Sequence, residues 1–173
     1  MKNKKYPKPL IFLHWFTLIL LVIEIILGLS LEDKEFSPKD FNWFRAHALL
    51  GVLIMILTFI RLYVRIKNKN RLPEIEFYGN MHKVIVTGVH HALYTLLIII
   101  PAVGFYMVYQ TGALQYDLGG PFPEGAQLDE SLHEIHESLV YVLIALVAMH
   151  VAGVMMYKMK TGENLLRRMC VKK

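Results

Sequence analysis

Four apolar segments, each long enough to cross a lipid bilayer, constrain this chain more than any other feature. They cover about residues 10–31, 47–66, 86–109 and 136–158. About 20 apolar residues in a helix span a hydrocarbon core roughly 30 Å thick, and a helix satisfies its own backbone hydrogen bonds in lipid. Hydrophobic residues make up 55% of the chain, and its mean hydropathy of +0.41 is too high for a soluble domain. The sequence therefore predicts an all-α fold, an integral membrane four-helix bundle that forms one domain over residues 1–173 and is surrounded by membrane lipid.

Basic residues are distributed unequally between the two sides of this bundle. Of the 19 Lys and Arg residues, only Lys34, Lys39 and Arg45 lie on the side opposite the termini, which leaves 16 on the side of the termini. The positive-inside rule then places both termini in the cytoplasm. The net charge of +5 follows from this asymmetry and does not indicate nucleic-acid binding, because a basic groove with interleaved aromatic residues is absent from the sequence.

The fourth segment carries two histidines, His136 and His150, fourteen residues apart. At 3.6 residues per turn and 1.5 Å per residue, the two imidazoles lie within about 40° of one helix face and about 21 Å apart along the axis. A polar group inside lipid normally faces the bundle interior and has a partner there. The spacing predicts two stacked metal or haem sites. The alternative is that each histidine only forms a hydrogen bond with another helix.

The remaining histidines in the segments can be sorted by depth. His47 enters the second segment from outside and shares the outer level with His136. The inner level holds His150 and three possible partners, His14, His90 and His91. Two imidazoles from different helices can bind the iron of a haem from both faces. A zinc or non-haem iron site would need carboxylates or thiolates beside the histidines, so haem is the better fit.

Three further residues are candidates for roles beside these levels. Arg61 lies fourteen residues after His47 and is predicted to pair with a propionate of an inner haem, or else to be an interfacial charge. Gly51, one turn beyond His47, leaves room either for a porphyrin or for close helix packing. Glu24 lies near the bilayer centre, where an ionised carboxylate costs about 2.5–3.5 kcal/mol, so we expect it to be neutral or paired.

Short motifs on all four segments resemble the bacterial cytochrome b561 family. They are IFLHW, FRAHALLG with RLYVR, GVHHALY with IIPAVG, and IHESL followed by AMHVAG, and the likeness extends to the NLLRRM tail. The resemblance is strongest to stand-alone members that oxidise superoxide, and it implies two haem b groups in a bacterial cell inner membrane. By this resemblance, His14 and His150 match the ligands of the cytoplasmic-side haem, and His47 and His136 match those of the outer haem.

The resemblance also implies a reaction with ubiquinone. His90 matches a histidine that approaches the quinone in these relatives. Tyr157 stands where they have a second quinone-side histidine, a departure that leaves the quinone position open. Both side chains can relay the protons that quinone reduction requires. The implied activity is a superoxide:ubiquinone oxidoreductase, with superoxide oxidised at the outer haem and quinone reduced on the cytoplasmic side.

Two other functions stay open at this point. One is an electron-transfer subunit that links quinone to an outer-face redox protein, and the other is a haem-free, histidine-lined metal or proton carrier. The outer connections carry ten acidic residues against three basic ones, and a negative surface repels an anion. If superoxide is the donor, Arg45, two residues before His47, is the candidate residue for steering it.

Overall fold

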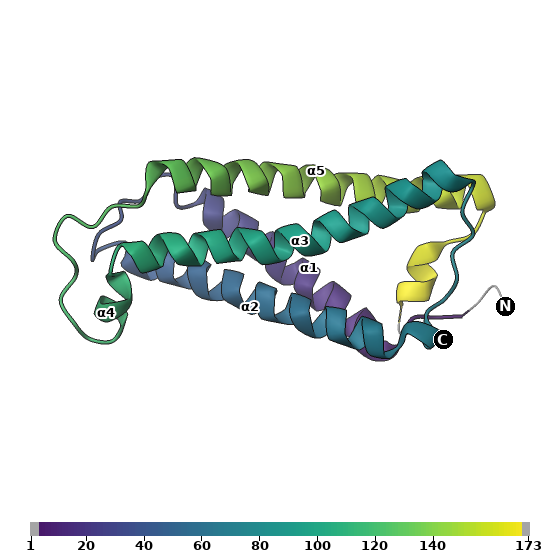
Figure 1. Cartoon of the computed structure of the whole chain (residues 1–173), viewed down its shortest axis with the longest axis horizontal. Helices are drawn as coiled ribbons and strands as arrows, with labels where there is room; N and C mark the ends of the chain where they lie inside the picture. Colours follow the sequence, from purple (N-terminus) through teal and green to yellow (C-terminus); the bar gives the residue numbers. More distant parts are fainter. Residues whose placement is uncertain (1–3, 171–173) are drawn as a thin grey trace.

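The computed structural model describes residues 4–170, which form helices and no strand. Four long helices run side by side along the longest axis (Figure 1). They are α1 (Lys8–Leu29), α2 (Phe41–Lys67), α3 (Asn80–Gln110) and α5 (Glu130–Thr161). All four are long and apolar enough to cross a membrane, which confirms the predicted all-α fold with four spanning helices. The basic residues Lys2, Lys172 and Lys173, counted in the charge argument, lie outside the described range.

Three of the helices extend well beyond the predicted apolar segments. α2, α3 and α5 each begin six residues before the segment they contain, because helical hydrogen bonding continues into polar residues. At the start of α5, the side chain of Asp129 accepts a hydrogen bond from the Leu132 N–H at 2.9 Å. This cap satisfies one of the backbone donors that every helix start leaves free.

The connection between α3 and α5, expected to be one long loop from Thr111 to Leu132, contains a short helix, α4 (Ala113–Asp117). The ring of Tyr116 on α4 packs edge-on against Phe41 at 5.1 Å and Phe122 at 5.2 Å. Aromatic rings in this arrangement add stability beyond the area they bury. The cluster fixes the connection against the first turn of α2.

The four long helices do not pack equally against one another. α1 packs on α2, α2 on α3, and α3 on α5, whereas α5 makes scarcely any close backbone contact with α1 or α2. All four long helices contribute apolar side chains to the core: Leu21, Ile54, Leu96, Leu97, Ile100 and Leu143. Pro101 lies inside α3 and removes a backbone hydrogen bond, and Figure 1 shows α3 changing direction near its middle.

The two ends of the described chain meet at the same end of the bundle. The Tyr6 N–H donates to the Arg168 carbonyl at 3.1 Å, and the Trp15 indole donates to the Met169 carbonyl at 2.8 Å. These bonds fasten the C-terminal 3-10 helix η2 (Leu165–Met169) to the start of α1. A chain with four spanning helices likewise has both termini on one side of the membrane.

Candidate functional site

The outer pair of histidines lies between α2 and α5. The ring centroids of His47 and His136 are 6.1 Å apart, with 74° between the ring planes. Glycines on the other two helices make room for the rings. A Cβ on Gly28 of α1 would lie 3.1 Å from His47 Cε1, and a Cβ on Gly104 of α3 would lie 3.1 Å from His136 Cε1. All four long helices therefore contribute to the outer site.

The inner pair lies between α1 and α5. The ring centroids of His14 and His150 are 6.4 Å apart, with 69° between the ring planes. His90 on α3 lies closer to His150, at 5.0 Å. The His90 Nδ1 is 2.6 Å from the Val86 carbonyl oxygen, which can only accept, so Nδ1 is the donor. Nε2 is then the acceptor atom of the His90 ring.

The geometry of both pairs can be tested against a bis-histidine iron. A metal ion held about 2 Å from each of two imidazole nitrogens places the ring centroids about 6 Å apart. The separations of 6.1 and 6.4 Å match this value, whereas the 5.0 Å between His90 and His150 is too short. The pairs therefore fit haem iron.

Hydrogen bonding does not account for these buried imidazoles. The Nδ1 atoms of His14, His47 and His136 are buried and have no hydrogen-bond partner. At this atom, none of the three histidines forms the hydrogen bond to another helix that the alternative interpretation requires. Within residues 4–170, no group of three or more His, Cys, Asp or Glu side chains is placed to hold a metal ion. The arrangement therefore favours paired ligands over a multidentate metal site.

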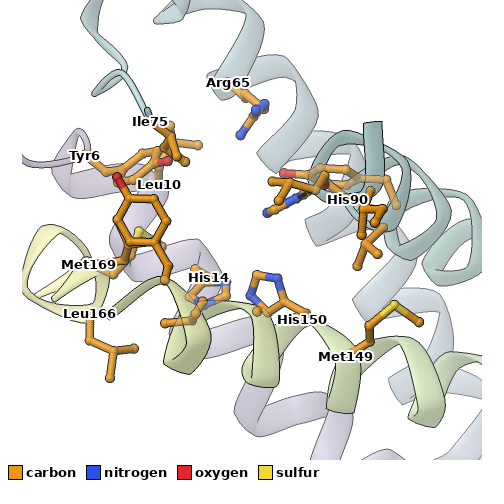
Figure 2. A pocket seen from close by; sticks show the side chains of 18 of the residues that line it. Tyr6, Leu10, His14, Arg65, Ile75, His90, Met149, His150, Leu166 and Met169 are labelled. Atoms are coloured by element: carbon orange, nitrogen blue, oxygen red, sulfur yellow. Dashed lines mark hydrogen bonds between the residues drawn. The ribbon is translucent and has the colours of Figure 1, made fainter. Parts of the chain in front are cut away.

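A cavity of about 170 Å³ opens beside the inner histidines (Figure 2). His14, His90 and His150 line it, as does Arg61, which was predicted near an inner haem. Its wall also includes residues that the sequence reasoning did not assign to the site: Tyr6, Arg65, His82 and Tyr94. The Arg61 guanidinium lies over the Tyr94 ring at 5.4 Å. Arg61 and Arg65 are four residues apart, so both cations lie on one helix face.

Tyr157, the other predicted quinone-side residue, lines the same cavity and is buried. Its ring stacks with His82, at a centroid distance of 6.5 Å, and its hydroxyl donates to Glu163 Oε2 at 3.5 Å. On the opposite wall, burial raises the pKa of the Tyr6 phenol, which therefore keeps its proton. Tyr6 and Tyr157 thus add two phenol hydroxyls to a cavity that also holds the acceptor nitrogen of His90.

The C-terminal helix η2 closes one side of the cavity. Leu165, Leu166 and Met169 line it, and the buried Arg168 holds them in place. The guanidinium of Arg168 donates to Glu163 Oε1 through Nη2 at 2.5 Å and to the Glu74 carbonyl through Nη1 at 2.6 Å. One side chain thereby connects η2 to the end of α5 and to the connection after α2.

Glu24 is placed beside the outer pair. Its Oε1 atom lies 3.2 Å from His47 Nδ1, although the atoms are not aligned as a hydrogen bond. A Cβ on Gly51 would lie 3.0 Å from the same oxygen and 3.7 Å from Pro101. Gly51 therefore makes room for the Glu24 carboxyl group and for close helix packing. The expectation that Glu24 is neutral or paired agrees with its position against His47.

Arg45, the predicted steering residue, is paired at the outer surface. Its Nε atom lies 2.9 Å from Asp117 Oδ1 at the end of α4, and the side chain stays half-exposed. Lys34 lies over the Trp43 ring at 5.6 Å. The pairing with Asp117 reduces the positive field that Arg45 presents to solution.

Comparison with known proteins is consistent with this arrangement. The sequence profile of the prokaryotic cytochrome b561 family matches residues 5–171. The chain is 25% identical to the probable superoxide oxidase CybB of Yersinia pestis over 177 residues, covering 99% of this chain and 98% of that protein. It is 23% identical to cytochrome b561 homolog 1 of Escherichia coli (strain K12) over 174 residues, covering 95% and 96% of the two chains.

Proposed function

Because this chain belongs to the prokaryotic cytochrome b561 family, whose members are membrane electron-transfer proteins with haem b, we propose that it carries electrons between the outer face of a bacterial inner membrane and the quinone pool. The observation that carries the proposal is the presence of two histidine pairs. The ring centroids are 6.1 Å apart in the outer pair, His47 and His136, and 6.4 Å apart in the inner pair, His14 and His150. His136 and His150 are fourteen residues apart on α5, so the two levels are about 21 Å apart.

These distances support the ligand assignment that we propose. His47 and His136 bind the outer haem, and His14 and His150 bind the inner haem. The shorter distance between His90 and His150, 5.0 Å, supports His14 rather than His90 as the inner ligand. The excess of basic residues near the two chain ends supports cytoplasmic termini, which puts the inner pair on the cytoplasmic side.

The cavity beside the inner pair is the proposed quinone site. A haem held by the inner pair of imidazoles would supply one-electron transfer to a quinone in this cavity. A quinone also needs two protons, which protein side chains must supply. His90 accepts a proton at Nε2 and passes it on, and Tyr157 donates from its hydroxyl. Arg61 and Arg65 on the same wall provide positive charge for haem propionates.

At the outer face we propose superoxide as the electron donor, as the name of the Yersinia pestis relative suggests. Two superoxide anions give up one electron each and leave as oxygen. One ubiquinone takes these two electrons and two cytoplasmic protons and leaves as ubiquinol. Arg45 is the proposed steering residue, and its partner Asp117 limits the field it provides.

Stopped-flow reduction of the oxidised protein by superoxide tests this activity. We expect fast haem reduction that slows with added salt and with Arg45→Glu, because screening weakens the attraction of an anion. Asp117→Asn removes only the opposing charge and should speed the reduction. Ubiquinone should reoxidise the haems. Rates no faster than those of free haem, or rates unaffected by both substitutions, would exclude steered superoxide oxidation.

A protein redox partner is the second candidate at the outer face. The acidic outer connections and the pairing of Arg45 with Asp117 favour it, because both lower the attraction for an anion. A basic donor or acceptor protein would then exchange electrons with the outer haem. The rate of this exchange would fall when Glu or Asp residues of the outer connections are neutralised, and superoxide would not compete with the partner protein. The haem-free carrier is separated from both candidates by colour, because a purified protein without haem is colourless.

A further inference from the structure

The Glu24 carboxylate is the one acidic side chain that lies against a proposed haem ligand among the described residues. Its carboxyl oxygen Oε1 is 3.2 Å from Nδ1 of His47, and its other oxygen is buried without a hydrogen-bond partner. The side chains of His47 and Glu24 are 23% and 13% exposed. A carboxylate in lipid is costly, so a position this close to an imidazole N–H needs an explanation.

The surrounding helices are shaped to hold this carboxylate. Gly51 on α2 faces Oε1, and a Cβ there would lie at 3.0 Å. Gly28 on α1 faces the adjacent atom of the His47 ring, where a Cβ would lie 3.1 Å from Cε1, 3.6 Å from Nδ1 and 4.0 Å from Nε2. Both α1 residues thus lie against the Nδ1–Cε1 edge of the His47 ring, with the carboxylate at Nδ1. This leaves Nε2 as the atom that can reach a metal.

We propose that Glu24 is a positioning residue for the outer haem: in the haem-bound protein it accepts a hydrogen bond from His47 Nδ1, fixes Nε2 as the ligand atom, and lowers the reduction potential of that haem. The inference rests on the proposed function, because it takes His47 as a ligand. A carboxylate that accepts the second ring proton makes the imidazole a stronger donor, and its negative charge stabilises the oxidised iron.

The inner level has the opposite electrostatic environment. The cavity there is lined by the cations Arg61 and Arg65, and no Asp or Glu lies among its lining residues. Positive charge stabilises the reduced state of a nearby haem, whereas the Glu24 carboxylate stabilises the oxidised state of the outer one. The two charges together make electron transfer from the outer to the inner level favourable.

Redox titration of the purified holoprotein tests this proposal, with Glu24→Gln as the main variant. Gln keeps the shape of the side chain but removes its charge. We expect the outer haem to become easier to reduce by about tenfold or more in its reduction equilibrium, equivalent to about 59 mV for one electron. The EPR signal of the oxidised outer haem should shift as well, while the inner haem keeps its potential. A role in packing alone would move neither quantity.

Three further variants assign the effect. Gly51→Ala places a Cβ against Oε1 and should raise the outer potential in the same direction, whereas Gly88→Ala, on α3 with nothing within 4 Å of the added carbon, should leave it unchanged. In His136→Ala, which is expected to retain only the inner haem, adding Glu24→Gln should change nothing. Should Glu24→Gln lose the outer haem, the potential is measured instead in Glu24→Asp, whose shorter carboxylate withdraws from Nδ1.

The outcomes separate this inference from the proposed function. A raised outer potential with an unchanged inner potential supports it. Unchanged potentials, a lowered outer potential, or equal shifts of both haems would overturn it while leaving the haem assignment intact. A purified wild-type protein that lacks haem would instead refute the proposed function itself.

Discussion

Gly104→Ala should selectively weaken binding of the outer haem. The added Cβ would lie 3.1 Å from Cε1 and 3.5 Å from Nδ1 of His136. Carbon atoms pack best about 3.5–4.0 Å apart, so the His136 ring has to retreat by about 0.4 Å or more. A displacement of this size moves the ligand nitrogen away from the position at which the two imidazoles can share one iron.

The magnitude follows from overpacking. Inserting a methyl group into a close-packed site costs about 1–3 kcal/mol. The haem-free protein avoids this cost by turning the ring away, so the cost falls on the haem-bound state. One factor of ten corresponds to about 1.4 kcal/mol, so outer haem affinity should fall by about five- to 150-fold. Overall stability should change less, because Ala in a helix interior is favoured over Gly by about 0.5–1 kcal/mol.

Haem titration of the detergent-purified variant measures this effect, with the inner haem as an internal reference. Gly88→Ala is the matched control on the same helix, because nothing lies within 4 Å of its added carbon. We expect Gly104→Ala to approach one haem per chain while Gly88→Ala retains two. Equal outer haem affinity in the two variants would refute the reasoning that Gly104 fixes the position of His136.

Three other predictions concern the inner end and the outer surface. His90→Ala and Tyr157→Phe should each slow quinone reduction and leave both haem spectra nearly unchanged, as single-turnover kinetics would show; loss of the inner haem in His90→Ala would make His90 the ligand. Arg168→Ala leaves Glu163 without its buried partner and should lower the free energy of unfolding by about 3–5 kcal/mol, as measured by thermal denaturation. A change of less than about 0.5 kcal/mol would contradict the described network. Reduction by superoxide should be faster at low than at high ionic strength, and Arg45→Glu should abolish this dependence.

Spacing along the chain was sufficient to predict the helices and the depth of each histidine. His136 and His150 share a face of α5 because fourteen residues make nearly four turns, and both face partners at their own depth. Depth alone did not separate His14 from His90, because both lie at the inner level. The two differ in lateral position, which depends on how the helices rotate and pack.

The remaining parts of the site have weaker sequence signals. Gly28 and Gly104 contact the outer histidines, but a glycine in an apolar helix does not indicate which neighbour it faces. Arg65 could have been assigned from its four-residue spacing to Arg61. No periodic pattern in the sequence predicts that Tyr6 contacts the C-terminal helix η2. The contact joins segments far apart in the chain and depends on single hydrogen bonds. α4 is too short for a periodicity to be recognised.

The walls of the inner cavity come from opposite ends of the chain, and this affects when the cavity can form during synthesis. Tyr6 is made before the four long helices and Met169 after them, yet both line the same space. The four paired histidines precede residue 151 and the last of the four long helices ends at Thr161, so a nascent chain can enter the membrane and bind the proposed haems before η2 exists. The Arg168 hydrogen bonds that hold η2 in place can form only after that segment has been made. If the proposed haems bind, a chain interrupted before Leu165 would be red but open beside the inner histidine pair, with reduced haem accessible to oxidants in solution.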